Sequence, residues 1–348
     1  MIEQFIPQLA RREALADEQV HQAVEWLTDP ALGAGPKAAF LAALAEKGET
    51  PAEIAAFVRA LRGKSLKPDL DPALREREIL DIVGTGGDRL GTINISTTAA
   101  LICAAAGVTV AKHGNRAVTS QAGSADVLEE LGIPINLPPD QAALALRDHQ
   151  FAFFFAQHYH PAFQHIGPAR KLCATRGQRT IFNLLGPLLN PAGPSAMLVG
   201  VPRPELCRPL AVVLQSLGVR RAMVVCGQVG LAGYLDELST LGDNTIAEFY
   251  QDHGFTVSLA RLDLFSLQPA KLADLKGGTK TENADIVRRI LRNEERGPKR
   301  DAVLLNAAAA LFVAGQAKSL IEGWDLAAET LDNGRAAAKL TELTQPPL

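Results

Sequence analysis

The chain has 348 residues, of which 47% are hydrophobic and 21% are charged, and its formal net charge is −3. This length predicts two domains, or one large and one small domain, with enough apolar residues for a sizeable core. The slight negative charge and the lack of a lysine- or arginine-rich run argue against a nucleic-acid or anionic-membrane surface.

We expect residues 1–70 to form a small helical domain. Apolar residues recur there at intervals of three and four positions, as in Ile2 and Phe5. The first helix mixes acidic with basic residues, unlike a secretory signal. The segment TPAE at residues 50–53 is a strong helix start, with a cap, a proline and an early acid. SLKPDLDP, residues 65–72, is expected to be a linker and a hinge.

Residues 71–348 are expected to form an α/β domain, with helices from about 160–180 joining the helical domain. Apolar strands alternate with helices, which is typical of a mostly parallel sheet covered by helices on both faces. The predicted strands lie at 79–84, 108–114, 151–156, 195–201 and 221–227. The predicted helices lie at 96–107, 124–132, 140–149, 204–218, 280–294 and 300–315, before a final alanine-rich stretch. The apolar segment LICAAAGVTVA is too short to span a bilayer.

The stretch DIVGTGGDRLGTINIST, from Asp81, predicts an anion-binding loop. It has neither the lysine of a P-loop nor the spacing of a dinucleotide fingerprint. Gly84, Gly86 and Gly87 follow a strand, and their N–H groups can form a nest for an anion. We expect Ser96 or Thr97 to cap the next helix, whose N-terminus favours negative charge. A tight turn followed by an ordinary cap is the alternative.

The next predicted strand ends in KHGNR, a basic and polar loop. Carboxyl ends of parallel strands meet at one edge of a sheet, so this loop is expected to share a cleft with the glycines. Lys112 would neutralise a phosphate there, and Thr119 and Ser120 would donate hydrogen bonds to it. The alternative for Lys112 and Arg116 is a pair of solvated surface charges.

Asp236 and Glu237, in GYLDELSTLGDNT, are candidates for holding magnesium. Mg²⁺ prefers one or two carboxylates together with phosphate oxygens and water. A plain acidic helix start or surface pair is the alternative interpretation.

The segment FFFAQHYHPAFQHIGPAR contains three histidines and an arginine. His158, His160 and His165 lack the spacing of a metal site, and the four widely spaced cysteines offer no partners; their spacing favours a reducing cytoplasm. Pro161 is expected to begin a helix that carries Arg170. An arginine can bind a carboxylate through two parallel hydrogen bonds, and a surface ion pair is the alternative.

The motifs GTGGD…NIST, KHGNR, GSAD, RTIFNLLGPLLNP and GPKRDAVLLNAAAAL resemble those of the anthranilate phosphoribosyltransferase family, over nearly the whole chain. The resemblance implies a nucleoside-phosphorylase-like α/β domain with a small helical domain, commonly dimerised through the helical part. It implies a glycosyltransferase of tryptophan biosynthesis that moves the phosphoribosyl group of phosphoribosyl pyrophosphate onto the amine of anthranilate and releases pyrophosphate.

The resemblance also assigns site residues, with Mg²⁺ as the cofactor and no catalytic nucleophile or base. Residues implied for phosphoribosyl pyrophosphate are Gly84, Gly87, Asp88, Thr92, Asn94, Ile95, Ser96, Thr97, Lys112, Thr119, Ser120 and Ser124. Residues implied for anthranilate are Gly84, His113, Asn115 and Arg170. Residues implied for the metal are Ser96, Asp236 and Glu237. No nucleic acid or membrane partner is expected, and the chain is expected to be a cytoplasmic homodimer.

The chain departs from the family pattern at Gln157, in about three extra residues near 173–176, and in a longer loop near 226–234. The first two changes affect the acceptor side of the site. A phosphoribosyltransferase with a different aromatic or heterocyclic acceptor is therefore the main alternative. A pyrimidine-nucleoside phosphorylase and a non-enzymatic nucleic-acid-binding relative are weaker ones, because NIST and KHGNR argue against the first and the acidic charge argues against the second.

Overall fold

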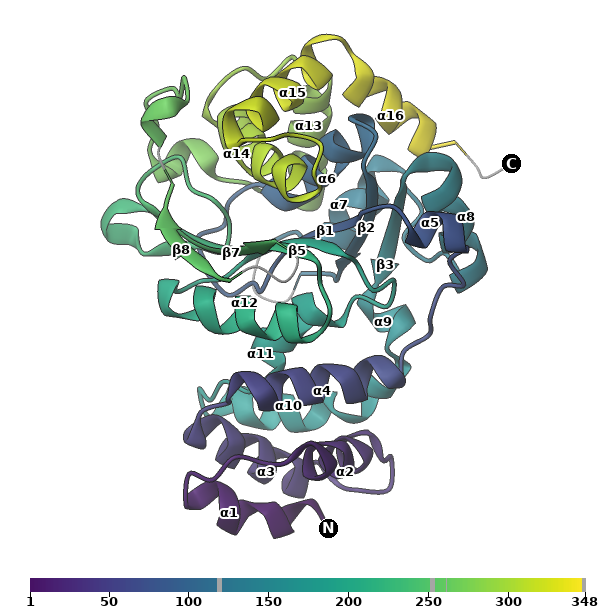
Figure 1. The fold of residues 1–348 in the computed structure, drawn as a ribbon, viewed down its shortest axis with the longest axis vertical. Coiled ribbons are helices and arrows are strands. Elements are labelled where there is room, and N and C mark those ends of the chain that lie inside the picture. The colour runs from purple at the N-terminus through teal and green to yellow at the C-terminus, as the bar shows by residue number, and fades with distance from the viewer. Residues whose placement is uncertain (118–120, 251–253, 261, 346–348) are drawn as a thin grey trace.

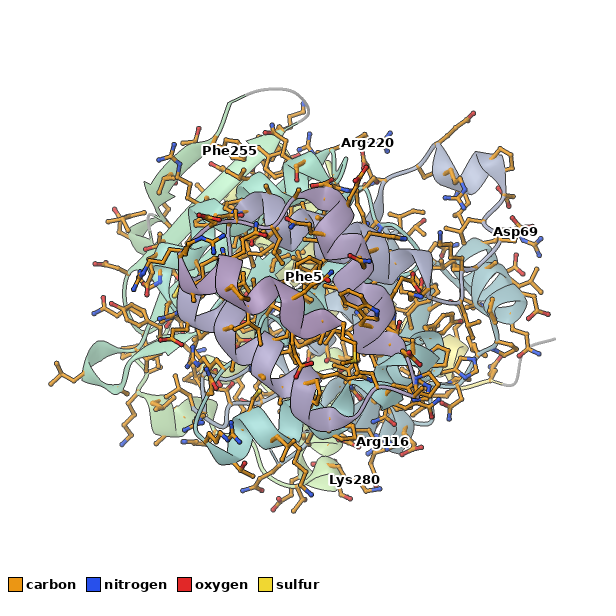
Figure 2. The ribbon with its side chains drawn as sticks, turned by 90° about the horizontal axis from the view of Figure 1, so that it is seen from below. Phe5, Asp69, Arg116, Arg220, Phe255 and Lys280 are labelled. Carbon is orange, nitrogen blue, oxygen red and sulfur yellow. The ribbon has the colours of Figure 1, made fainter. Side chains whose placement is uncertain are left out.

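The computed structural model describes residues 1–117, 121–250, 254–260 and 262–345. The N-terminal part is helical, and Figure 1 shows it as a separate layer at the end of the molecule. Its elements are η1 (Ile2–Phe5), α1 (Ile6–Ala10), α2 (Asp17–Thr28), α3 (Ala34–Lys47) and α4 (Pro51–Gly63). Figure 2 views the molecule from this end, with Phe5 near the centre of the helical layer. Thr50 begins α4 as predicted, because its side chain accepts a hydrogen bond from the backbone N–H of Glu53.

The remaining chain forms an α/β layer structure around one sheet, in the order β3-β2-β1-β4-β5-β7-β8, with β6 paired to β5. The strands are β1 (Ile79–Gly84), β2 (Thr109–Gly114), β3 (Phe151–Phe155), β4 (Ala196–Gly200), β5 (Arg221–Gln228), β6 (Tyr234–Leu235), β7 (Asn244–Tyr250) and β8 (Thr256–Leu259). The first five are parallel, as predicted. β6, β7 and β8 are antiparallel and were not predicted.

Helices cover both faces of the sheet (Figure 1). The longer helices of this part are α6 (Ile95–Ala105), α7 (Ser124–Leu131), α8 (Pro139–His149), α10 (Gly167–Thr175), α12 (Cys207–Ser216), α13 (Lys280–Leu291), α14 (Pro298–Val313), α15 (Leu320–Asp332) and α16 (Arg335–Leu343). Short helical turns are α5 (Pro72–Arg75), α9 (Ala156–Tyr159), η2 (Pro161–His165), α11 (Phe182–Leu185), η3 (Gly186–Leu189), η4 (Pro204–Leu206), η5 (Gly230–Ala232), η6 (Leu262–Leu264) and η7 (Leu272–Leu275).

Alternate residues along the strands enter different cores. Leu198 and Val225 face a core that includes α6 and α14, whereas Val199 and Val224 face a core that includes α12. The second core continues without a break into the helical layer, where it includes Phe40. The helical layer and the sheet are therefore packed through shared apolar residues, mainly where α4 contacts α12.

The expectation of one helix from Pro161 to Arg170 is wrong. Pro161 begins only the short turn η2, and α10 starts afresh at Gly167. α10 lies beside α3, in the helical layer. Within the described residues, the chain has no helix of sufficient length and hydrophobicity to cross a bilayer.

Candidate functional site

The order of the parallel strands reverses at β1, which makes the ends of β1 and β4 a favoured place for a ligand. β2 and β3 lie on one side of β1, and β4 and β5 lie on the other. In open α/β sheets, ligands bind outside the carboxyl ends of the strands at such a switch point. Both strands end in glycine here. Gly84 of β1 and Gly200 of β4 lie opposite each other as a pair in the parallel sheet.

An acidic turn, formed by Asp236 and Glu237, lies directly against these strand ends. A Cβ atom at Gly84 would lie 2.2 Å from Asp236 Oδ2, and one at Gly200 would lie 1.6 Å from the backbone oxygen of Asp236. Neither strand end can carry a side chain while the turn keeps this position. The two glycines therefore let a carboxylate reach the switch point.

The carboxylates of the acidic turn accept hydrogen bonds from the predicted anion-binding loop. Gly86 N donates to Asp236 Oδ2 at 2.6 Å, and Ser96 N donates to Glu237 Oε1 at 3.1 Å. Gly86 and Gly87 have φ angles of 75° and 89°, a conformation that glycine adopts without strain. The glycine loop, the start of α6 and the acidic turn thus converge on one spot.

The expectation that Ser96 or Thr97 caps α6 is wrong. α6 begins at Ile95, and Asn94 is its N-cap residue without a side-chain capping bond. Ser96 lies inside the first turn, and its N–H finds its acceptor in Glu237, 141 positions along the chain. The side chain of Thr97 is buried in the first turn of α6.

Two buried asparagines hold the acidic turn, and the sequence analysis did not identify them. Asn306 of α14 accepts a hydrogen bond from Leu238 N and donates one to Leu238 O, both at 2.9 Å. Asn244 of β7 does the same with Ser239 N at 2.6 Å and Ser239 O at 2.8 Å. A side-chain amide can satisfy a donor and an acceptor together, which fixes the backbone after Glu237. The sequence does contain one indication of this role, since Asn306 is a polar residue inside the apolar run LLNAAAAL.

Negative charge is concentrated at this turn. Burial raises the pKa of Glu237 to about 7, and burial followed by the charge of Asp88 raises the pKa of Asp236 well above its ordinary value. Burial also raises the pKa of Asp88. Lys112 is buried nearby, its Nζ donates to Ile82 O at 2.7 Å, and burial lowers its pKa. Lys276 lies near Asp88 and opposes the rise in its pKa, and Lys112 is shared with Asp81, so two lysines face four carboxyl groups and the spot favours a further cation.

The loop after β2 contacts the glycine loop, as the strand order predicts. Asn94 Nδ2 donates to Ala122 O at 3.2 Å, and Ser124 Oγ donates to Asn115 O at 3.3 Å. Thr92 bridges to Lys276, and the side chain of Ile95 is buried, so Ile95 can offer a ligand only its backbone. Two further predicted residues lie outside the described part of the chain: Thr119 and Ser120.

A run of rings joins the end of β2 to Arg170. His113 lies edge-on to His160 with ring centroids 5.4 Å apart, and His160 stacks on Phe163 at 5.0 Å. Phe163 meets Phe182 edge-on at 5.7 Å, and Arg170 Cζ lies 5.3 Å from the Phe182 centroid. This wall of rings ends at a guanidinium, which suits a flat aromatic carboxylate.

Two of the predicted acceptor contacts, Asn115 and Arg170, are exposed. Asn115 Oδ1 accepts a weak hydrogen bond from Gln157 Nε2 at 3.4 Å. Gln157 is one of the positions that depart from the family pattern, so this departure touches a predicted acceptor residue.

The histidines of the wall are buried and neutral. Burial lowers the pKa of His113 to about 3 and that of His160 to about 4. His113 Nδ1 lies 3.2 Å from Gly186 O, and its Nε2 has no partner among the described residues. Arg62 reaches the same place from α4, where its Nε donates to Leu188 O at 2.8 Å and burial lowers its pKa to about 10. Sequence reasoning missed Arg62, which has no motif around it.

The longer loop after β5 forms an antiparallel hairpin with β5. β5 pairs with β6 at Gly227 and Leu235, which returns the chain to the acidic turn. Val229 and Leu235 also pack with Leu90 of the glycine loop. The extra residues near 173–176 form the end of α10, where Cys173 Sγ donates to Ala38 O of α3 at 3.6 Å.

Known proteins resemble the chain over almost its full length. Residues 3–65 match the family model "Glycosyl transferase family, helical bundle domain", and residues 76–337 match "Glycosyl transferase family, a/b domain". An anthranilate phosphoribosyltransferase of Petrotoga mobilis is 42% identical over 345 residues, which cover 99% of this chain and 96% of that protein.

Solved structures of anthranilate phosphoribosyltransferases also resemble the chain over almost its full length. The crystal structure of anthranilate phosphoribosyltransferase from Thermus thermophilus matches with a TM-score of 0.87 and 42% identity, covering 97% of this chain and 98% of that one. The Saccharomyces cerevisiae enzyme in complex with phosphoribosyl pyrophosphate and magnesium matches with a TM-score of 0.87 and 26% identity, covering 99% of this chain and 96% of that one.

Gly200→Ala is expected to lower the free energy of unfolding by about 2–3 kcal/mol, because its Cβ overlaps the backbone of Asp236. Urea denaturation at pH 7 measures this loss. Gly35→Ala is the matched control, since nothing lies within 4 Å of a Cβ there. Equal stability of the two variants would contradict the close approach of the acidic turn.

His160→Gln is expected to reduce the loss of stability on acidification. The folded-state pKa of His160, about 4, lies below the ordinary value of 6.5, so its neutral ring stabilises the fold above pH 6.5 and this contribution is lost as the pH falls towards 4. Between pH 7 and pH 5, the wild type should lose about 2 kcal/mol more than the variant.

Urea denaturation at several pH values gives the free energy of unfolding as a function of pH for the wild type and for His160→Gln. Asp81 and Glu237 have raised pKa values, about 6 and about 7, and act in the opposite direction. Their contribution is common to both proteins and cancels. Parallel stability curves for wild type and variant would mean that His160 titrates alike in the folded and unfolded chains.

Proposed function

The chain belongs to the anthranilate phosphoribosyltransferase family, and we propose that it transfers the phosphoribosyl group of phosphoribosyl pyrophosphate to the amine of anthranilate. The observation that carries this proposal is the convergence of the glycine loop, the start of α6 and the acidic turn at the switch point of the sheet. The wall of rings that leads to Arg170 supports an aromatic acid as the acceptor.

The glycine loop and the loop after β2 would bind the donor substrate. Backbone N–H groups of Gly86 and Ser96, together with the helix dipole of α6, suit the charge of a pyrophosphate group. Lys112 is buried between Asp81 and Glu237 and would add a positive charge beneath it. The remaining predicted residues carry over from the family motifs in the same loops: Gly84, Gly87, Asp88, Thr92, Asn94, Ile95, Thr97, Thr119, Ser120 and Ser124.

The acidic turn fits magnesium. Among the described residues, no set of three or more His, Cys, Asp or Glu side chains forms a preassembled metal site. Mg²⁺ does not need one, since it commonly takes one or two carboxylates and completes its octahedron with substrate oxygens and water. Asp236 and Glu237 supply buried oxygen ligands whose charges repel each other, and Ser96 lies beside Glu237. When bound, the ion would neutralise charge on the departing pyrophosphate.

The reaction requires little acid or base from the protein. The bond from C1 of the ribose to pyrophosphate oxygen breaks, its electrons leave with pyrophosphate, and the amine nitrogen forms the new bond to C1 before it loses a proton. An aryl amine is neutral at pH 7, so its lone pair is available. The chain's own residues would hold the leaving group at Gly86 and Ser96 and orient the acceptor at Asn115 and Arg170.

His113 and His160 would serve as neutral walls of the acceptor site. Their lowered pKa values keep them uncharged at pH 7, so neither would bind the acceptor carboxylate as a cation. We propose in addition that the protein is a homodimer joined through its helical layer, which light scattering of the purified protein would test.

Incubation of the purified protein with phosphoribosyl pyrophosphate, Mg²⁺ and a panel of aromatic amines is expected to consume anthranilate and release pyrophosphate. Mass spectrometry of the products identifies the acceptor. Consumption of another amine, with anthranilate inert, would remove the acceptor assignment and leave the donor assignment standing.

Arg170→Ala is expected to raise the KM for anthranilate roughly tenfold to a hundredfold, because a hydrogen bond to a charged group contributes about 1.5–3 kcal/mol. The KM for phosphoribosyl pyrophosphate should change little. Arg176→Ala is the control, as an exposed arginine that follows the same helix. An equal rise in both KM values for Arg170→Ala would count against an acceptor role.

A further inference from the structure

Both backbone donors on which pyrophosphate binding would depend are already hydrogen bonded within the protein. Gly86 N donates to Asp236 Oδ2 and Ser96 N donates to Glu237 Oε1. Each N–H group offers one hydrogen. A phosphate oxygen that takes either donor must therefore replace a carboxylate oxygen.

The exchange can involve only the side chains of the acidic turn. The backbone of Asp236 lies against Gly200, and the backbone after Glu237 is held by Asn306 and Asn244. The turn itself is fixed, whereas carboxylates rotate about their side-chain bonds. A carboxylate that leaves its donor in this buried place needs a new partner, because an unpaired buried charge is costly.

We propose that Asp236 and Glu237 act as displaceable caps on the phosphate-binding amides, and that a divalent cation releases these amides by taking over the carboxylates. The proposal deepens the proposed function and rests on it. The carboxylates then have two alternative partners, the amides or the cation. Cation binding and pyrophosphate binding are thereby coupled through the protein, in addition to any direct contact between the two ligands, and the coupling is reciprocal.

A displaceable cap and a simple metal ligand predict different changes in pyrophosphate affinity when Glu237 is removed. If Glu237 only bound the metal, its removal would weaken pyrophosphate binding in Mg²⁺, and in a chelator the alanine and glutamine variants would show the same effect of lost charge. If Glu237 also caps Ser96 N, its removal frees a donor and should strengthen binding of pyrophosphate in the presence of a chelator.

The test is calorimetric titration of the full-length protein with inorganic pyrophosphate, in EDTA and in Mg²⁺. In EDTA, Glu237→Ala is expected to bind roughly fivefold or more tightly than the wild type, within the usual range of such couplings. In Mg²⁺ the order should reverse. A gain of affinity cannot arise from a misfolded variant.

Two controls separate the cap from charge alone. Glu237→Gln removes the charge but keeps an oxygen that can accept from Ser96 N, so it should gain less affinity in EDTA than Glu237→Ala. Asp325→Ala removes an exposed acid far along the chain and reports the effect of net charge. Equal gains for the alanine and glutamine variants, or no gain for the alanine variant, would overturn the cap.

Hydrogen exchange of the wild type provides a measurement that needs no variant. Mg²⁺ alone should speed exchange of the amides of Gly86 and Ser96, because they lose their carboxylate acceptors. Slower or unchanged exchange at both would overturn the proposal. Failure of the wild type to bind pyrophosphate even in Mg²⁺ would instead overturn the proposed function, and the inference with it.

Discussion

The seating of the Asp236–Glu237 turn on the ends of β1 and β4 is the constraint on which the site depends. It requires glycine at both strand ends, since a Cβ atom there would overlap Asp236. It also brings carboxylates to donors 150 and 141 positions distant in the chain. Oxygen ligands and anion-binding amides thus occupy the same small volume, which is the arrangement that a reaction with a metal-bound pyrophosphate leaving group requires.

The protein fixes the backbone of this turn with asparagine side chains. Asn306 and Asn244 each pair with both the N–H and the C=O of one residue beyond the turn. Neutral amides fix the backbone without satisfying the carboxylates electrostatically. The negative charge of the turn therefore stays available to a cation, while its position does not change.

The sequence predicts the parallel core of the fold and the motifs that line the strand ends, because apolar strands and glycine-rich loops have strong local signals. In the antiparallel edge, β6 and β8 are short, with two and four residues, and give little signal, whereas the seven-residue β7 was missed despite its length. The cap of α6 was wrong because the helix begins at Ile95, so Ser96 lies inside it, and the acceptor of Ser96 N is Glu237, a contact across 141 positions that no local pattern reports. Arg62 was missed in the same way, since its position depends on a hydrogen bond to Leu188, 126 positions away.

The apolar core that runs from the sheet through α12 into the helical layer limits how the two parts can move. Wide opening about the 65–72 segment would bring the α4–α12 contact into water, at roughly 25 cal/mol for each Å² of apolar surface. Small sliding of packed helices exposes far less. Any movement between the two layers is therefore expected to be a short shear along the face of α12, which would carry Arg62 at the end of α4 with it.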